Sequence, residues 1–549
     1  MSKPVTTAEV WLWGSKVGYL YQPEGSKLVQ FEYDRDFLRS GIEISPIMMP
    51  LSENIYAFND LADIPAFKGT AGVFADSLPD KFGNQIIDAW LTAQGRAKDS
   101  FTVIERLCYT GNRGMGALEY RPASSPASAE EDLDVTEMVK LASSILEGKK
   151  NVTLSDKRAS IAQLIEIGSS AGGARAKAVI ALNEKTGEIR SGQLQNGSDF
   201  DYWLIKFDGV SKNGDHNVND GKQYTNIEYA YYLMAKDAGI NMSDCRLLEK
   251  DGLCHFMTKR FDRENGAKLH MVTLAGLAHL DYNTPCVCSY EMYTEYARRI
   301  GVTQHEVEEM YRRMVFAVEG VNCDDHVKNF SFLMNKKGEW HISPAYDITF
   351  AYNPDNEWIS KHQMTINGKS SEITDIDMIT CGKKMGLEEN FCKETIDKVR
   401  AIVSDWVKYA EKANISENRT MDIALALEEI RGTELKGITS EQRQFHLERM
   451  KNEAKLKSEA AYVSLGTQIK DLCKGEGITP ETLARTIGIK PNVMKSVVND
   501  KRVPSPSTIS KIADYFHIDE KSLVQAAIEV EKQIGSQNVS KKPSGNSEH

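Results

Sequence analysis

The segment VNCDDHVKNFSF, residues 321–332, decides how this chain is interpreted. It places two adjacent acids, a histidine, a lysine and an asparagine within six residues, with apolar residues on both sides. Burying so many polar groups costs free energy unless they are hydrogen-bonded or paired. The segment is therefore expected to be a loop that two packed segments hold in place, with its polar side chains at fixed separations.

The spacing within this segment is typical of phosphoryl-transfer chemistry. That reaction needs a carboxylate to orient the attacking hydroxyl, and in protein kinases an Asn that binds magnesium follows this Asp by five residues. Asp324 and Asn329 are five residues apart, whereas Asp325 is only four before Asn329, so Asp324 is the predicted base. Lys328 could neutralise the transferring phosphate, and His326 is expected to hold the loop by hydrogen bonding. A solvated loop with an N-capping Asp is the alternative.

A further metal ligand is expected soon after this segment. Residues 329–348, NFSFLMNKKGEWHISPAYDI, are predicted to form two strands around a Lys-Lys-Gly turn. In kinases a separate Asp after a hairpin completes the metal site. Asp347 occupies that position, so Asn329 and Asp347 are the predicted ligands of Mg²⁺.

Two upstream segments offer what a nucleotide needs. GSSAGGARAKAVIAL, residues 168–182, is a Gly-rich turn that leads into a strand, and YWLIKF, residues 202–207, places Lys206 in mid-strand between apolar residues. Kinases hold the phosphates with a Gly-rich loop and a lysine on an adjacent strand. The alternative for Lys206 is an ammonium group that reaches solvent from the edge of a strand.

The composition is that of an ordinary soluble globular protein. The chain has 549 residues, of which 41% are hydrophobic and 26% charged, and is long enough for two to four domains. No apolar run approaches the ~20 residues that span a bilayer, and the N-terminus lacks the apolar core of a signal peptide. Nine cysteines without a CxxC pair predict reduced thiols. We therefore expect a cytoplasmic protein with no membrane partner.

Five segments differ in composition. Residues 1–122 begin with aromatic-rich, alternating stretches that predict a small α+β subdomain, and residues 135–430 predict a larger α+β body. Residues 431–465 are highly charged and predict a helical connector. A compact apolar pattern returns at residues 466–527, and residues 528–549 have nothing to bury and are expected to be disordered.

Residues 466–527 have the rhythm of a helix-turn-helix. Thr479 is a predicted N-cap with Pro480 at the first helical position, Gly488 allows a tight turn, and KPNVMKSVVN predicts a second helix. The net charge of −11 argues against nucleic-acid binding over the whole surface. This segment, however, has nine Lys and Arg against seven Asp and Glu.

The pattern resembles the Xre/Cro-type repressor domain, whose recognition helix enters the major groove of DNA. The resemblance implies that base edges or phosphates are contacted by Lys490, Asn492, Lys495 and Ser496, and that the DNA backbone is contacted by Lys501 and Arg502. A two-fold operator would require a homodimer, which the connector helix could support. A small protein-interaction bundle is the alternative.

Residues 1–430 resemble the HipA family of bacterial serine/threonine kinases, the toxins of persistence-related toxin–antitoxin modules. The motifs that carry the resemblance lie in family order: GVFADSLPD, GNRGMGALEY, SSAGGARAK, IEYAYYLMAKDAGI, KRFDR, DDHVKNFSF and SPAYDI. The resemblance implies an α+β, two-lobed kinase-like HipA fold, here followed by an all-α helix-turn-helix domain. It also implies ATP and Mg²⁺ as cofactors and a protein substrate, which in the family is a translation factor or an aminoacyl-tRNA synthetase.

The resemblance also implies roles for individual residues. Asp324 would be the catalytic base, Asn329 and Asp347 the magnesium ligands, and Lys206 a contact to the nucleotide phosphates. The adenine and ribose would lie against a hinge formed around Lys259, Phe261 and Asp262. The phosphate-proximal loop would contain Ser169, Ser170, Gly172, Gly173 and Lys177, with Ser170 or Ser169 as an inhibitory autophosphorylation site.

The chain departs from the family pattern at two positions. Lys259 stands where the family often has an acid, which leaves the adenine-side contacts open, and Ala176 stands where a proline is more usual. Neither change removes a predicted catalytic group.

Three functions fit these features. The first is an active serine/threonine kinase, dependent on Mg²⁺ and ATP, whose fused module binds operator DNA and restrains the kinase. The second is a transcriptional repressor whose kinase-like body is inactive or senses a small ligand, and the third is phosphorylation of a small molecule. The complete set of Asp324, Asn329 and Asp347 favours the first, because a decayed site would be expected to lose at least one of them.

Overall fold

The computed structural model describes residues 5–123 (without 80, 94, 98 and 99), 138, 176–192, 199–209, 223–460 (without 265 and 266), 465–516 (without 500), 523, 524 and 527. The chain divides into two compact units, Met1–Thr439 and Ser440–His549. The predicted tail, residues 528–549, lies outside the described residues, as does the Gly-rich loop up to residue 175.

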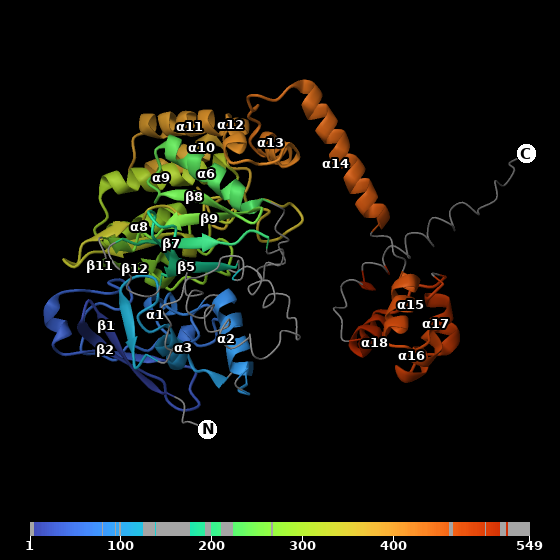
Figure 1. The fold of residues 1–549 in the computed structure, drawn as a ribbon, viewed down its shortest axis with the longest axis horizontal. Helices are drawn as coiled ribbons and strands as arrows, with labels where there is room; N and C mark the ends of the chain where they lie inside the picture. The colour runs from blue at the N-terminus through green and yellow to red at the C-terminus, as the bar shows by residue number, and fades with distance from the viewer. Residues whose placement is uncertain are drawn as a thin grey trace, which may run out of the picture. The chain divides into compact units, whose positions relative to one another are not determined.

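The first unit begins with a four-stranded antiparallel sheet in the order β3-β2-β1-β4 (Figure 1). Its strands are β1 (Thr7–Leu12), β2 (Ser15–Tyr21), β3 (Gln30–Tyr33) and β4 (Leu118–Arg121). Alternate residues of β1 are buried, as expected for a sheet with one face on a core. The connection from β3 to β4 carries η1 (Phe37–Ser40), η2 (Asn59–Leu61), α1 (Gly72–Ala75), α2 (Lys81–Ala93) and α3 (Val103–Thr110).

The body contains two further sheets. The larger has five antiparallel strands in the order β6-β5-β7-β9-β8: β5 (Lys177–Leu182), β6 (Ile189–Ser191), β7 (Asp201–Lys206), β8 (Cys245–Lys250) and β9 (Leu253–Lys259). The smaller has the order β12-β13-β14: β12 (His270–Thr273), β13 (Ser331–Met334) and β14 (Trp340–Ile342). Strands β13 and β14 confirm the hairpin predicted after the opening segment. A short hairpin, β10 (Arg263–Glu264) and β11 (Ala267–Lys268), lies between the two sheets in the sequence.

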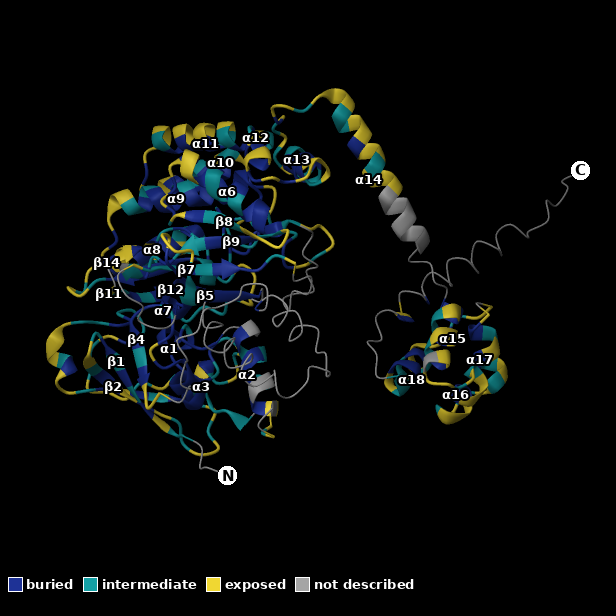
Figure 2. Cartoon of the chain, in the orientation of Figure 1, coloured by how far each residue is buried: buried dark blue, intermediate teal, exposed yellow. Residues whose placement is uncertain are grey.

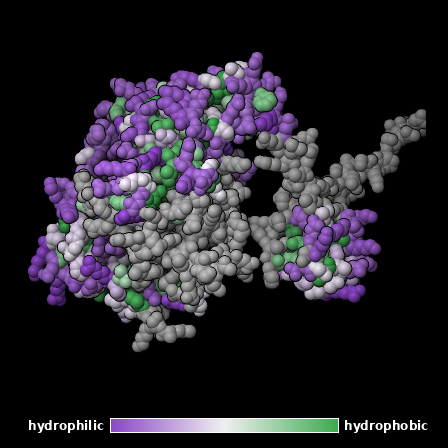
Figure 3. Space-filling view, viewed as in Figure 1, coloured by the Kyte–Doolittle hydropathy of each residue, from purple (hydrophilic) through white to green (hydrophobic). Residues whose placement is uncertain are grey.

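Helices surround these sheets. Helix α6 (Tyr224–Ala238) contacts β8 and β9. Further helices in the described part of this unit are α7 (Leu274–Ala278), α8 (Tyr290–Arg299), α9 (Gln304–Glu319), α10 (Asp375–Lys384), α11 (Glu389–Val403), α12 (Trp406–Lys412) and α13 (Glu417–Arg431). Figure 3 shows mainly hydrophilic side chains over the outward side of the α10 and α11 region, as expected for amphipathic helices that cover a core.

The N-terminal sheet and the body share one hydrophobic core (Figure 2). That core joins Val10 and Phe74 to Tyr231 and Phe316. A second cluster packs Ile86 and other α2 side chains against β5 and β7. The small N-terminal subdomain is therefore part of the same unit as the body.

The second unit is helical. It contains α14 (Ser440–Ala460), α15 (Leu465–Gly475), α16 (Pro480–Thr486), α17 (Pro491–Val497) and α18 (Pro506–Phe516). The Thr479 hydroxyl accepts a hydrogen bond from the Thr482 amide at 3.2 Å, and Gly488 has a φ of +73°, which confirms the predicted N-cap and turn. The connector helix begins later than expected, because Gly432, at φ +67°, ends α13.

No helix in the described part of the chain is long and apolar enough to cross a membrane.

Two histidines, the buried His270 and the partly buried His279, join the N-terminal subdomain to the body and predict acid sensitivity. His270 donates from Nε2 to the Ile44 carbonyl at 2.8 Å, and His279 Nε2 accepts from the Gly72 amide at 3.0 Å. Burial lowers the pKa of each histidine from 6.5 to about 4. Above pH 6.5 the ring is neutral in both the folded and the unfolded state. Between pH 6.5 and about 4 the unfolded chain takes up a proton and the folded protein does not, so the free energy of unfolding falls as the pH is lowered through this range.

We therefore expect the free energy of unfolding to fall between pH 6.5 and 4, as measured by denaturant titration at several pH values. The variant His279→Gln cannot take up a proton, so its stability should depend less on pH in this window. An equal pH dependence in both proteins would contradict this origin of the acid sensitivity.

Candidate functional site

The opening segment begins where α9 ends. Val321 adopts a left-handed conformation (φ +51°) although it is β-branched, which is unfavourable unless other contacts hold it. The Tyr231 hydroxyl donates to the Gly320 carbonyl at 2.6 Å, and the Cys323 amide donates to the Ala351 carbonyl at 2.9 Å. These bonds fix the chain just before Asp324.

Burial distinguishes the two adjacent acids. Asp325 is 3% exposed; its carboxylate accepts from the Tyr290 hydroxyl at 2.9 Å and the Gln363 amide at 2.7 Å, and lies 3.0 Å from His362 Nδ1. The Asp324 side chain is 40% exposed. Asp325 therefore holds the loop internally, and Asp324 is the acid that a substrate can reach.

The indole of Trp358 also contacts this acid. Its Nε1 donates to Asp324 Oδ1 at 2.7 Å, and Trp358 itself is buried. His326 Nε2 lies 3.9 Å from the same oxygen, and the His326 ring is close to the rings of Tyr282 and Trp358. His326 thus packs within the loop through its ring, and the side-chain hydrogen bond expected from the sequence is not among the contacts of the described residues.

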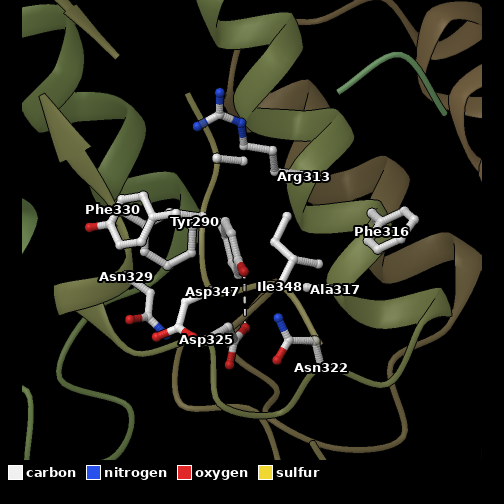
Figure 4. A pocket seen from close by; sticks show the side chains of 12 residues that line it. Tyr290, Arg313, Phe316, Ala317, Asn322, Asp325, Asn329, Phe330, Asp347 and Ile348 are labelled. Carbon is white, nitrogen blue, oxygen red and sulfur yellow. Dashed lines mark hydrogen bonds between the residues drawn. The ribbon is translucent and has the colours of Figure 1, made fainter. Parts of the chain in front are cut away.

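Asn329 and Asp347 line one cavity, which Figure 4 shows from close by. Asn329 lies in the short helix η4 (Val327–Asn329), and its Nδ2 donates to the Asp324 carbonyl at 2.9 Å, which orients the carboxamide. Asp347 has a φ of +57°, an uncommon conformation that turns it out of the strand direction after β14. One carboxylate and one amide oxygen match the small protein ligand set of Mg²⁺, which usually keeps waters and substrate phosphates as its other ligands.

One lysine pairs with Asp347, and a second lysine lies opposite the first in the sheet. The register of β5 and β7 places Lys177 directly opposite Lys206, and these residues are only 3% and 5% exposed. Like charges directly opposite each other are unfavourable unless acids compensate them. The Lys206 ammonium lies 2.6 Å from Glu228 Oε1 and also pairs with Asp347. These two buried lysines form a cationic site, which Lys206 connects to the predicted metal ligand Asp347.

Glu228 was missed in the sequence. It lies on α6, is buried, and forms the ion pair with the strand lysine that active protein kinases also require. The sequence did contain a signal, because NIEYAYYLM places this acid between apolar residues of a predicted helix. A buried acid is rare in proteins unless a partner compensates its charge.

The hinge residues have separate surroundings. The Lys259 ammonium pairs with Asp201 at 2.8 Å and is half exposed, and the Phe261 ring lies 5.5 Å from that of Tyr346. Lys328, in the predicted catalytic loop, makes two contacts of a different kind. Its ammonium group lies 4.7 Å from the Tyr282 ring, and its backbone carbonyl accepts a hydrogen bond from the Tyr346 hydroxyl at 2.9 Å.

Asp262 is the buried residue of the hinge segment. It is 0% exposed and accepts from Arg260, from Arg263 and, at 2.7 Å, from the Gly116 amide of the N-terminal subdomain. Burial alone would raise the pKa of this carboxyl, but the two guanidinium groups hold it well below its ordinary value. Its oxygens join the hinge to the N-terminal subdomain, so the carboxylate is engaged within the protein, and contact of the hinge segment with adenine or ribose stays a prediction.

The remaining predicted phosphate-loop residues, Ser169, Ser170, Gly172 and Gly173, lie outside the described residues.

In the second unit, most of the predicted DNA-contacting side chains are exposed: Lys490, Asn492, Lys495, Lys501 and Arg502. Ser496 is half-buried, and its hydroxyl donates to the Asn492 carbonyl at 3.0 Å within α17. The apolar side of the same helix, with Met494 and Val497, packs into the core of the module. The exposed cations therefore lie on the helix-turn-helix surface that faces away from its core.

Two family models match the first unit. The HipA N-terminal domain matches residues 8–121, and the HipA-like C-terminal domain matches residues 169–406, which together make up more than half of the chain. The chain belongs to the HipA family. A helix-turn-helix model also matches residues 469–523, so this HipA-family protein carries both modules in one chain.

A solved structure confirms the HipA-like fold, and a second match is weaker. One is the Shewanella oneidensis MR-1 toxin–antitoxin complex of HipA, HipB and operator DNA, with a TM-score of 0.56 and 16% identity over 80% of this chain and 99% of that chain. The kinase CtkA of Helicobacter pylori covers 41% of this chain and 92% of that chain at 11% identity, but its TM-score of 0.26 is too low to support a conclusion. No curated protein matches the chain.

The Trp358 contact gives a prediction for this HipA-family site. Trp358→Phe keeps the ring but removes the hydrogen bond to Asp324, and a hydrogen bond to a charged group contributes about 1.5–3 kcal/mol. We expect kcat for phosphoryl transfer to fall by about tenfold or more, with KM for ATP unchanged. Trp406→Phe is the control, because its indole donates to the Thr420 carbonyl at 2.9 Å within the helices α12 and α13. That variant should lose stability and retain kcat; equal kcat in Trp358→Phe and wild type would contradict the prediction.

Proposed function

We propose that this HipA-family protein is a serine/threonine protein kinase, dependent on ATP and Mg²⁺, whose own helix-turn-helix module binds operator DNA. The observation that carries the proposal is the buried connection of Lys206 to both Glu228 and Asp347, beside the cavity that Asn329 lines. The same ion pair and the same order of acid and amide serve phosphoryl transfer in protein kinases.

In this proposal each group has one task. ATP with Mg²⁺ supplies an activated phosphoryl group, with Asn329 and Asp347 as the metal ligands and Lys177 and Lys206 facing the phosphates. Asp324 accepts the proton of the attacking serine or threonine hydroxyl. Lys328 offers a positive charge next to the base, and Asp325 and Trp358 keep the loop in position.

Autophosphorylation of the Gly-rich loop on Ser170 or Ser169 is part of the proposal, as is a separate protein substrate. The test is incubation of the full chain with labelled ATP and Mg²⁺, followed by mapping of the modified residues. Label on wild type that is absent from Asp324→Asn would support the kinase. A wild-type protein that binds no nucleotide would instead favour the repressor with an inactive body.

Operator binding by the same chain is supported by the complete helix-turn-helix and by the DNA in the structurally similar HipA–HipB complex. We expect Lys501→Ala/Arg502→Ala to weaken binding to operator and non-operator DNA by similar factors, since cations that contact phosphates carry no sequence information. The slope of log affinity against log salt concentration should fall by about 2, one for each lost contact.

The matched control for charge is Lys408→Ala/Lys412→Ala, which removes two exposed cations from the first unit. Mobility shifts at several salt concentrations measure both variants. An unchanged salt slope in Lys501→Ala/Arg502→Ala would exclude these two residues from the DNA contact.

A further inference from the structure

The motif GVFADSLPD lies in the N-terminal subdomain, yet one of its side chains reaches into the body. The Asp76 carboxylate accepts from the Thr273 amide at 2.7 Å and from the Thr273 hydroxyl at 2.8 Å. Thr273 ends β12 and is the N-cap of α7, where its hydroxyl accepts from the Gly276 amide at 3.0 Å. One carboxylate thus holds the point at which strand and helix join.

The backbones of α1 and α7 approach each other closely at this point (Figure 2). A Cβ on Gly72 would lie 2.2 Å from the Gly276 carbonyl oxygen, and a Cβ on Gly276 would lie 2.3 Å from Asp76 Oδ2. His279, just after α7, accepts from the Gly72 amide. No side chain fits between the two elements, so the position of the Asp76 carboxylate is tightly determined.

The other side of this junction holds the predicted catalytic loop. The Leu274 amide donates to the Phe330 carbonyl at 2.8 Å, and Thr273 pairs with Ser331 across β12 and β13. Phe330 and Ser331 directly follow Asn329, the predicted metal ligand. A displacement of Thr273 would therefore be passed to Asn329 through two adjacent backbone contacts.

Charge connects Asp76 to the same loop. Burial raises the pKa of the Asp76 carboxyl, and the positive charge of Lys328 opposes this shift. Asp76 also acts on the hydroxyl of Tyr346, which donates to the Lys328 carbonyl and directly precedes Asp347. The carboxylate thus acts electrostatically on a cation and a tyrosine that are neighbours in sequence of the predicted metal ligands.

We propose that Asp76 is a positioning residue for phosphoryl transfer, through which the N-terminal subdomain holds Thr273, Lys328 and the catalytic loop in their active arrangement. This inference rests on the proposed kinase function. It gives the subdomain a task in the reaction itself.

The test compares Asp76→Asn with wild type in the full chain, by kcat and KM for ATP and by denaturant unfolding. Small displacements of reacting groups can cost up to about 100-fold in rate, so we expect kcat to fall by about 10- to 100-fold. KM for ATP should change less than about twofold, because the cationic site of Lys177 and Lys206 is unaltered. The free energy of unfolding is expected to fall moderately, as for the control variant Asp377→Asn, because one amide oxygen cannot replace both carboxylate oxygens at Thr273, so kcat is compared for the folded proteins.

The chain offers a closely matched control. Asp377 is buried and also accepts from the amide and the hydroxyl of one threonine, Thr374, at 3.0 and 2.6 Å, but in α10. Asp377→Asn should lower stability and leave kcat unchanged. A second check is a double-mutant cycle with Lys328→Met. If part of the effect of Asp76→Asn comes from its electrostatic interaction with Lys328, that part is already lost in Lys328→Met, so Asp76→Asn should lower kcat less in that background.

The outcomes separate the two proposals. A wild-type protein that transfers no phosphate overturns the proposed function, whereas an active wild type with unchanged kcat in Asp76→Asn overturns only the role of Asp76. Should Asp76→Asn fail to fold, Thr273→Val and Thr273→Ser decide instead. Loss of kcat in Thr273→Val with retention in Thr273→Ser supports the positioning role, and equal kcat in both contradicts it.

Discussion

Asp324→Asn will lower the rate of phosphoryl transfer by about 10²- to 10⁴-fold, the range typical for loss of a general base. The amide of asparagine keeps the shape of the side chain and an oxygen that can accept from Trp358, but it cannot take the proton of the substrate hydroxyl. Binding of ATP and Mg²⁺ should persist, because the lysines and Asp347 are unchanged. Single-turnover kinetics and equilibrium binding of a labelled nucleotide measure the two effects separately.

Asp325→Asn is the matched control, one residue away. Its carboxylate accepts two hydrogen bonds and lies against His362, so the amide leaves at least one buried group unsatisfied. We expect a loss of stability of about 1–3 kcal/mol. The catalytic rate of the folded fraction should fall far less than in Asp324→Asn. A larger rate loss in Asp325→Asn than in Asp324→Asn would show that the base has been assigned to the wrong acid.

Lys206→Met is expected to have the other large effect, on both stability and activity. Removal of one partner from a buried ion pair typically costs about 3–5 kcal/mol, because the remaining charge has no compensation. Here the Glu228 carboxylate would remain buried without this ammonium group. Denaturant unfolding measures the first effect, and nucleotide binding together with kcat measures the second.

The double variant Lys206→Met/Glu228→Gln distinguishes stability from function. With Glu228 neutralised as well, much of the lost free energy of unfolding should return. Activity should remain low, since neither the phosphate contact nor the ion pair is restored. Recovery of activity together with stability would contradict a role for Lys206 in the reaction.

Local sequence patterns predicted several parts of the structure correctly. The N-cap at Thr479, the turn at Gly488 and the hairpin of β13 and β14 each depend on residues that are close in the sequence. Caps, turns and hairpins form through contacts of this range, so their residue types identify them directly. The choice of Asp324 over Asp325 also came from a spacing along the chain.

Contacts between distant elements could not be predicted in this way. Glu228 meets Lys206 across 22 residues, Trp358 meets Asp324 across 34, and Asp76 meets Thr273 across 197. The motif around Asp262 likewise does not reveal that Gly116 and two arginines surround its carboxylate.

The sequence by itself therefore determined the HipA-type order of motifs, the helix-turn-helix and the spacing of the predicted catalytic acid and the predicted metal-binding amide. Only the tertiary structure decided which acid is exposed, which partners balance each buried charge, and that the N-terminal subdomain and the catalytic loop meet at Thr273. The physical reason is the separation along the chain of the residues that interact. Hydrogen-bonded turns and helices depend on neighbours in the chain, whereas the cost of burying a charge depends on every group that packing brings within a few ångströms.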